Sequence, residues 1–535
     1  MVITWTTLNA TESIVEYGLW GGKLFTQSAR GNCTTFVDGG SEKRKIYIHR
    51  VTLSELIPGF TYVYHCGSEA GWSDVLYFTA LIESTSFSPK FALFGDMGNE
   101  NPQSLARLQK ETQVGMYDVI LHIGKPFYVV VLNSELNDKA QVTKPKIHIS
   151  EYLQRDFAYD MHEDEGRIGD EFMKQIESIA AYVPYMTCPG NHEWAYNFSH
   201  YRSRFNMPGQ TEGLWYSWNI GSAHIISFST EVYFYLEYGL DLLFRQYEWL
   251  KGDLEEANKP ENRAARPWII TMAHRPMYCS NNDHDDCTKF ESYVRLGRND
   301  TDPPAPGLED LFYRQGVDLE FWAHEHTYER LWPVYNYKVF NGSTEEPYMN
   351  PRAPVHIITG SAGCREKHDG FIPKPREWSA FRSTDYGYTR MHLINSTHIY
   401  LEQVSDDQWR LACRFGALSG HIASVHFLPK TSTGWYYHYP HLPQVMKAKA
   451  SLTVASKPFH KPARRSPDGL RSLHPPCKPT RCLQPQCHFS GGSFPLAHYK
   501  EPLLLADILA VELHLMTIQE CSINRRTQHG VFEYY

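Results

Sequence analysis

The sequence predicts a small all-β sandwich followed by a larger α/β domain. Residues 1–80 contain short runs rich in β-branched and aromatic residues, separated by Gly, Asn and Ser turns, as the strands of a sandwich are. From residue 91 onward, apolar strands alternate with helical stretches, which is typical of an α/β fold. With 535 residues, 42% hydrophobic and 21% charged, the chain is long enough for two or more domains and is not disordered by composition.

The sandwich strands are expected at residues 3–7, 14–18, 45–53, 61–66 and 75–79. After the third strand, a Pro58-Gly59 turn is followed by Tyr62. This stretch resembles fibronectin type III-like domains, in which a tyrosine after such a turn locks a corner of the sandwich, although an ordinary half-buried hairpin has a similar signature. Residues 81–90, which include a Ser/Thr-rich stretch, are expected to be a linker.

The α/β domain is expected to span residues 91–408. Its strands are near-continuous apolar runs at residues 91–94, 119–121, 268–270, 319–322 and 355–358, as expected where helices cover both faces of a sheet. Helices are expected near residues 102–113, 170–182, 245–258 and 307–315. Several strands run directly into polar residues that can hold a metal, and the carboxyl ends of strands are where open α/β sheets build their sites.

Five short segments carry these polar residues. They are Gly95-Asp96, the pair Asp156 and Tyr159, Asn191-His192, His274, and His324-Glu325-His326. Each alone is weak evidence, because a Gly-Asp after a strand is usually a turn and a lone histidine usually binds no metal. Five of them in one chain are hard to attribute to turns, so the joint pattern predicts a metal centre.

The ligand types predict two unlike metals. The anionic oxygens of one group suit a small trivalent ion and the neutral donors of the other suit a borderline divalent ion. The first group is Asp96, Asp156 and a Tyr159 phenolate, and the second is Asn191, His274 and His324. Asp156 is the natural bridging carboxylate, and His326 is placed to serve a different ion from His324. Two such metals can clamp a phosphate and ionise a bound water for phosphoryl hydrolysis.

These residues resemble those of the purple acid phosphatases, within the calcineurin-like metallophosphoesterases. The resemblance covers nearly all of residues 1–407 and implies a metallophosphoesterase sandwich of two mixed β-sheets flanked by helices, preceded by a fibronectin type III-like sandwich. It implies that Fe(III) is held by Asp96, Asp156, Tyr159 and His326, and a divalent Zn, Fe or Mn ion by Asp156, Asn191, His274 and His324. Related Ser/Thr phosphatases and nucleases lack the phenolate ligand.

Two further histidines match family positions that line the substrate. His192 follows the ligand Asn191, and His284 lies ten residues after His274. A protonated imidazole can bind a phosphate dianion or protonate the leaving alkoxide, so the match implies catalytic roles for His192 and His284. For His284, which lies in a polar loop, a plain solvated histidine is the alternative.

One departure from the family pattern is an insertion over residues 125–155. Removing these residues joins Gly124 to Asp156 and restores the Gly-Asp-X-X-Tyr run of the family. Closing a loop of this length costs little chain entropy, but metal ligands must be held within about 0.5 Å.

The tail at 409–535 is also unfamiliar, with 15 Lys+Arg against 6 Asp+Glu, and is expected to be poorly ordered. Both features suggest an alternatively spliced or imperfectly predicted form.

The predicted function is that of an acid phosphatase acting on a small phosphate monoester or a phosphoprotein. One alternative is a calcineurin-like phosphodiesterase or nucleotide pyrophosphatase, which Tyr159 disfavours. Another is a catalytically impaired isoform that acts as a binding protein, which the insertion favours. Residues 1–408, outside the tail, are acidic overall, with 37 Lys+Arg against 54 Asp+Glu, so no nucleic-acid partner is expected. No membrane association is expected, and the sequence leaves open whether the protein forms a homodimer.

The family resemblance implies a secreted protein, extracellular or lysosomal. Six glycosylation sequons fit an exported glycoprotein: Asn9, Asn32, Asn197, Asn299, Asn341 and Asn395. The chain nevertheless opens at Met1 with no basic segment followed by an apolar one, so no signal peptide is visible.

Overall fold

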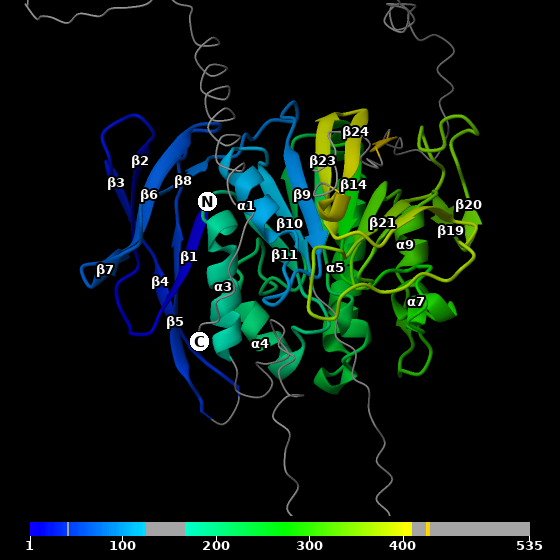
Figure 1. Cartoon of the computed structure of the whole chain (residues 1–535), viewed down its shortest axis with the longest axis horizontal. Coiled ribbons are helices and arrows are strands. Elements are labelled where there is room, and N and C mark those ends of the chain that lie inside the picture. Colours follow the sequence, from blue (N-terminus) through cyan, green and yellow to red (C-terminus); the bar gives the residue numbers. More distant parts are fainter. Residues whose placement is uncertain (40–41, 125–165, 409–423, 428–535) are drawn as a thin grey trace, which may run out of the picture. The chain divides into compact units, whose positions relative to one another are not determined.

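The computed structural model describes residues 1–39, 42–124, 166–408 and 424–427 of the chain. The amino-terminal sandwich consists of two antiparallel sheets (Figure 1). The first contains β1 (Val2–Thr7), β5 (Lys45–Thr52) and β4 (Asn32–Val37), and the second contains β3 (Gln27–Arg30), β2 (Ile14–Leu19), β6 (Thr61–Ser68), β7 (Gly71–Trp72) and β8 (Leu76–Thr79). All five expected strands are confirmed. Strands β3, β4 and β7 were not predicted, because their side chains are mostly exposed and their alternation is weak.

The turn after β5 is locked as the sequence predicts. The backbone N–H of Ile57 donates to the Tyr62 hydroxyl at 2.9 Å. Tyr62 itself is buried among Tyr17, Val51 and Phe78 in the core of the sandwich. The tyrosine therefore satisfies a loop amide while contributing its ring to the core.

The second domain contains two mixed sheets, as the fold class predicted. The first sheet has the order β11 (Tyr185–Cys188), β10 (Val119–Ile123), β9 (Lys90–Gly95), β23 (Gly387–Asn395), β24 (His398–Ser405) and β25 (Ser424–Phe427). The second has the order β12 (Tyr216–Ile220), β13 (Ala223–Ser227), β14 (Trp268–Met272), β17 (Leu319–Trp322), β21 (Val355–Thr359), β18 (Tyr328–Leu331) and β22 (Ser379–Ser383). Strands β9, β10 and β11 are parallel, and so are β13, β14, β17 and β21.

The two sheets pack face to face, and helices cover their outer faces (Figure 1). Phe91, Leu93 and Leu121 of one sheet and Ile270 and Phe321 of the other meet in one buried cluster. The helices are α1 (Leu105–Gln113), α3 (Gly166–Ala180), α4 (Ala195–Arg204), α5 (Asp241–Ala257), α6 (Pro260–Ala265), α7 (Asp286–Lys289), α8 (Tyr293–Leu296) and α9 (Glu309–Arg314). The four expected helices correspond to α1, α3, α5 and α9. None of the helices in the described ranges has the length and apolar character that spanning a membrane requires.

Specific contacts join the sandwich to the α/β domain. The Tyr64 hydroxyl donates to the carbonyl of Ala181 at 2.7 Å, and Arg44 binds both Asp38 and Asp170. Strand β8 ends at Thr79 and β9 begins at Lys90, which leaves the connection where a linker was expected.

Two expectations fall mostly outside the described residues. The insertion at 125–155, with Asp156 and Tyr159 after it, is one of them, and most of the tail at 409–535 is the other. Within the range given for the tail, β25 pairs with β24 as an antiparallel strand, and the expected lack of order in the rest of the tail stays a prediction. The open edge of β24 offers unpaired backbone groups, so a short strand can add there without a core of its own.

Leu93 tests the role of the core between the sheets. Its side chain is fully buried in β9, three residues before the predicted ligand Asp96. We expect Leu93→Ala to lower the free energy of unfolding by about 2–5 kcal/mol, because the cavity cannot collapse between two sheets. Leu24, 57% exposed, is the matched control, and Leu24→Ala should stay within about 0.5 kcal/mol. Urea unfolding followed by fluorescence measures both, and equal losses would contradict the packing argument.

His122 in β10 makes stability depend on pH. Its ring lies among Phe94, Phe172 and Tyr185, and the Tyr185 hydroxyl lies 2.9 Å from Nδ1. Burial lowers the pKa of His122 to about 3, well below the value of about 6.5 for a free imidazole. Between those values the unfolded chain binds a proton that the folded chain does not, so stability falls as the pH falls.

We therefore expect the thermal unfolding midpoint to decrease as the pH is lowered from about 7 to about 4. His122 should contribute at most about 1.4 kcal/mol of unfolding free energy per pH unit to this decrease. The His122→Asn variant should show a smaller fall over the same range, whatever its starting stability. Thermal unfolding at several pH values measures the slope. An identical slope in the variant would show that the folded protein protonates His122 as readily as the unfolded chain does.

Candidate metal centre

The predicted ligands lie at the carboxyl ends of parallel strands from both sheets. Asp96 follows β9 and Asn191 lies just after β11, both in the first sheet. His274 follows β14 and His324 follows β17 in the second sheet. Asp96 and His274 are completely buried, Asn191 is buried, and His324 is partly buried, with 9% of its side chain exposed. The strand-end placement that the sequence predicted is therefore present for these four residues.

Three neutral donors converge in the same space. The Oδ1 atom of Asn191 lies 2.8 Å from Nε2 of His274, and that nitrogen lies 3.3 Å from Nδ1 of His324. Ligands bound at about 2.1 Å around a tetrahedral ion lie about 3.4 Å from one another. Both of these separations are close to that value, and the amide and imidazole donors are of the types that suit a borderline divalent ion.

Asp96 connects the two strand ends. Its Oδ2 atom accepts from the backbone N–H of His324 at 2.9 Å, and its own N–H donates to the carbonyl of Gly124 at 2.9 Å. Asp96 and His324 both adopt left-handed backbone conformations, with φ of 58° and 71°. Such conformations are uncommon for residues other than glycine and are found where the surrounding structure holds them.

The site leaves no room for a side chain at Gly124, the last described residue before the insertion. A Cβ atom there would lie 2.6 Å from Cα of Gly190 and 2.9 Å from Nδ1 of His274. Gly124 also has φ of +25°, which side chains disfavour. A glycine at this position allows β10 to end against the two loops that carry Asn191 and His274.

Burial and neighbouring charges keep His274 neutral. Burial is the larger cause and lowers the pKa of His274 well below its usual value, and the nearby charges of His324 and Arg275 lower it further. A metal binds the neutral imidazole, so an acid environment would not readily protonate this nitrogen. The imidazole is thus in its ligating form over a wide pH range.

A cation lies beside the neutral donors. Arg275 Nη1 lies 3.0 Å from Nε2 of His324, and Arg275 Nε pairs with Glu231 at 3.1 Å. The guanidinium also stacks 4.1 Å from the ring of Phe234. Burial alone would lower the pKa of Arg275, but the charges of Glu231 and Asp285 raise it, so the group stays protonated.

The remaining predicted residues have different surroundings. His326 is buried, with Nδ1 3.0 Å from the Lys367 carbonyl and 3.3 Å from the Cys364 sulfur, so its ring contacts differ from those of His324. His192 is 1% exposed and lies close enough to His274 for its protonated form to lower the pKa of His274. His284 is exposed with φ of 69°, and within the described ranges no hydrogen bond joins it to the centre. Asp156 and Tyr159 lie outside these ranges, so the full ligand set stays a prediction.

Three residues around the centre were not predicted. Arg275 and Asp285 both contact His324, and Asp369 accepts from the backbone N–H of His326 at 2.6 Å. Arg275 directly follows a predicted ligand, which could have drawn attention to it. Asp285 lies between Cys279 and Cys287, which form a disulfide, and a pair of cysteines eight residues apart was the available signal.

The fold and the strand-end site define a calcineurin-like phosphoesterase, and the family models agree. Residues 89–328 match "Calcineurin-like phosphoesterase", residues 1–80 match "Purple acid Phosphatase, N-terminal domain" and residues 353–410 match "Iron/zinc purple acid phosphatase-like protein C". The chain belongs to the purple acid phosphatase family and is a phosphatase.

Individual relatives support this assignment. The chain is 73% identical over 410 residues to "Acid phosphatase type 7" of Danio rerio, which covers 76% of this chain and 86% of that protein. It is 56% identical over 408 residues to the Homo sapiens protein of the same name, with 76% and 85% covered. The solved purple acid phosphatase PPD1 from Lupinus luteus has a TM-score of 0.60 at 23% identity, with 80% of this chain and 72% of that chain covered, and supports the fold.

Gly124 gives a direct test of the geometry. We expect Gly124→Ala to weaken Zn²⁺ binding by at least about tenfold, because the added methyl displaces Gly190 and His274. Gly252 in α5 is the control, since a Cβ there meets nothing within 4 Å and alanine stabilises a helix by about 0.5–1 kcal/mol. Zn²⁺ titration of metal-stripped protein measures the effect, and undiminished binding by Gly124→Ala would contradict the site as described.

Proposed function

We propose that this chain is an acid phosphatase that hydrolyses phosphate monoesters at a centre of Fe(III) and a divalent Zn, Fe or Mn ion. The observation that carries the proposal is that the donor atoms of Asn191, His274 and His324 lie together at the strand ends. His274 Nε2 is 2.8 Å from Asn191 Oδ1 and 3.3 Å from His324 Nδ1. Buried Asp96 beside them adds the anionic oxygen that a trivalent ion needs. Membership of the purple acid phosphatase family supports the choice of iron.

The ligands divide between the two ions as the family pattern implies. Asn191, His274 and His324 would hold the divalent ion and Asp96 and His326 the Fe(III), with Asp156 and Tyr159 completing the set. When bound, the two ions would polarise the phosphoryl oxygens and lower the pKa of the attacking water.

The chain itself supplies binding and proton transfer. His192 is buried beside Asn191, and its imidazole would hold a phosphoryl oxygen or donate a proton to the leaving oxygen. His284 lies on the neighbouring exposed loop, where the same role stays a prediction. Arg275 would stabilise negative charge near His324, since Glu231 holds its guanidinium in place.

We further propose a secreted protein, extracellular or lysosomal, acting on small phosphate monoesters or phosphoproteins. The Cys279–Cys287 disulfide supports an oxidising compartment. Sequon residues Asn9, Asn32, Asn299 and Asn395 are exposed, as glycosylation requires.

The proposal is tested by metal analysis, the visible spectrum and two substrates. We expect purified protein to hold two metals, to absorb in the visible through Tyr159 and Fe(III), and to prefer p-nitrophenyl phosphate over its bis ester. His274→Ala should lose more than about tenfold in kcat/KM together with the divalent ion, whereas exposed His398→Ala should lose neither.

Each alternative predicts a different result. Preference for the diester would favour a phosphodiesterase. Colourless protein without metals or activity would favour the catalytically impaired isoform and would contradict the proposal.

A further inference from the structure

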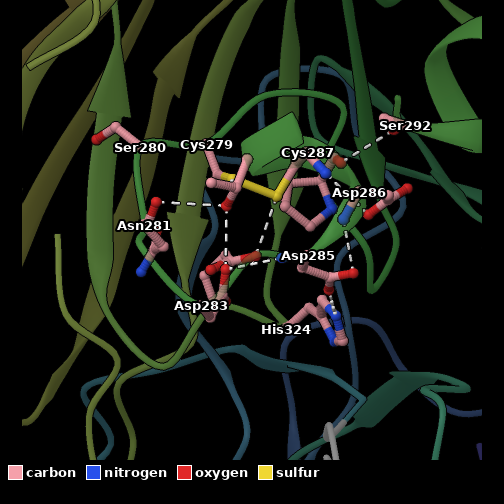
Figure 2. The surroundings of a disulfide bond; sticks show 12 residues. Cys279, Ser280, Asn281, Asp283, Asp285, Asp286, Cys287, Ser292 and His324 are labelled. Atoms are coloured by element: carbon pink, nitrogen blue, oxygen red, sulfur yellow. Dashed lines mark hydrogen bonds and ion pairs between the residues drawn. A yellow bond between two sulfur atoms is a disulfide. The ribbon is translucent and has the colours of Figure 1, made fainter. Parts of the chain in front are cut away.

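Asp285 lies on a short loop that is closed by a disulfide. Cys279 and Cys287 are bonded (Figure 2), and the segment that they close lies between β14, which ends at Met272, and α7, which contains Cys287. The Asp285 side chain accepts from the backbone N–H of Asp286 at 2.7 Å and so caps α7. The loop is therefore held at both ends and at its cap.

Other contacts fix the same loop to the segment after His326. Ser280 donates to Glu329 through its N–H at 2.9 Å and its hydroxyl at 2.6 Å. Asn281 Nδ2 donates to the Thr327 hydroxyl oxygen at 3.1 Å. Because His324 and His326 lie just before these partners, the loop and the histidine segment are joined as one unit.

Asp285 Oδ2 contacts Nε2 of His324, as Figure 2 shows. An ionised carboxylate can only accept a hydrogen bond, so the Asp285 contact needs the proton on Nε2, whereas the Arg275 guanidinium, 3.0 Å from the same nitrogen, can only donate and needs a lone pair there. We assign the proton to Nε2, because this tautomer leaves the Nδ1 lone pair facing the neutral donor His274. The other ring nitrogen, Nδ1, then keeps its lone pair, and it lies 3.3 Å from His274 Nε2. Arg275 Nη1 lies 3.5 Å from the same carboxylate oxygen and balances its charge.

We propose that Asp285 is the positioning residue of His324: it holds the proton on Nε2 and aims Nδ1 at the divalent ion. The inference rests on the proposed function, because it requires that ion. Carboxylates that orient a ligating histidine raise its basicity, and their loss costs about 10–100-fold in metal affinity. The disulfide-closed loop carries this carboxylate, which gives the loop a role at the centre although it holds no ligand of its own.

The test compares Asp285→Asn with Asp286→Asn. Asparagine caps a helix as well as aspartate does, so Asp285→Asn removes the charge without removing the α7 cap. Asp286 is the matched control on the same loop, because it accepts from the N–H groups of Cys287 and Tyr293, and within the part of the chain that the structure describes no hydrogen bond joins it to His324. Metal-stripped full-length protein is titrated with Zn²⁺ against a chromophoric chelator, and with Co²⁺ to record its visible absorption.

We expect Asp285→Asn to weaken Zn²⁺ binding about 10–100-fold and to change the Co²⁺ absorption, with the thermal midpoint of the metal-free protein close to that of the wild type. Asp286→Asn should keep the wild-type affinity and spectrum. Wild-type affinity and absorption in Asp285→Asn would overturn the inference alone, and equal losses in both variants would reduce Asp285 to a structural residue. Absence of Zn²⁺ binding by the wild type would overturn the proposed function and this inference with it.

Discussion

The hydrogen bond between Asp96 Oδ2 and the backbone N–H of His324 is the contact on which the centre depends. It joins the end of β9 in one sheet to the end of β17 in the other, at 2.9 Å. Both residues have left-handed backbones, which cost free energy of about 1–3 kcal/mol each. The tightly packed core between the sheets must supply that energy, so the geometry of the site is maintained by residues such as Leu93 and Phe321 that touch no ligand.

The same close approach explains the small residues at the strand ends. A Cβ atom on Gly95 would lie 2.3 Å from Cβ of Ala323, so these residues set how near Asp96 and His324 can come. Charged side chains, held in place by ion pairs, surround the centre. Glu231 pairs with Arg275, and Arg275 and Asp285 both contact His324. Neutral donors inside and a balanced ion pair outside are compatible with a buried cation site.

Much of this arrangement could be predicted from the sequence, for a physical reason. Strands buried on both faces are continuous apolar runs, so β9, β14 and β17 and the polar residues after them, such as Asp96 and His274, were visible directly. Exposed β3 and β4 lack that signal, and the α3 start was misplaced by four residues. The contact of Asp285 with His324 was not predictable, because it depends on how the Cys279–Cys287 loop closes.

The position of the insertion divides the two halves of the centre. Strand β10 keeps its parallel register with β9 and β11, and the Gly124 carbonyl still accepts from Asp96, so the chain is in place up to the residue before the insertion. Asn191, His274 and His324 come from segments that are held by their own strands. Of the implied ligands only Asp156 and Tyr159 depend on how the chain returns after residue 155. A defect caused by the insertion should therefore appear first in the iron, whereas a defect of the fold would remove both metals together.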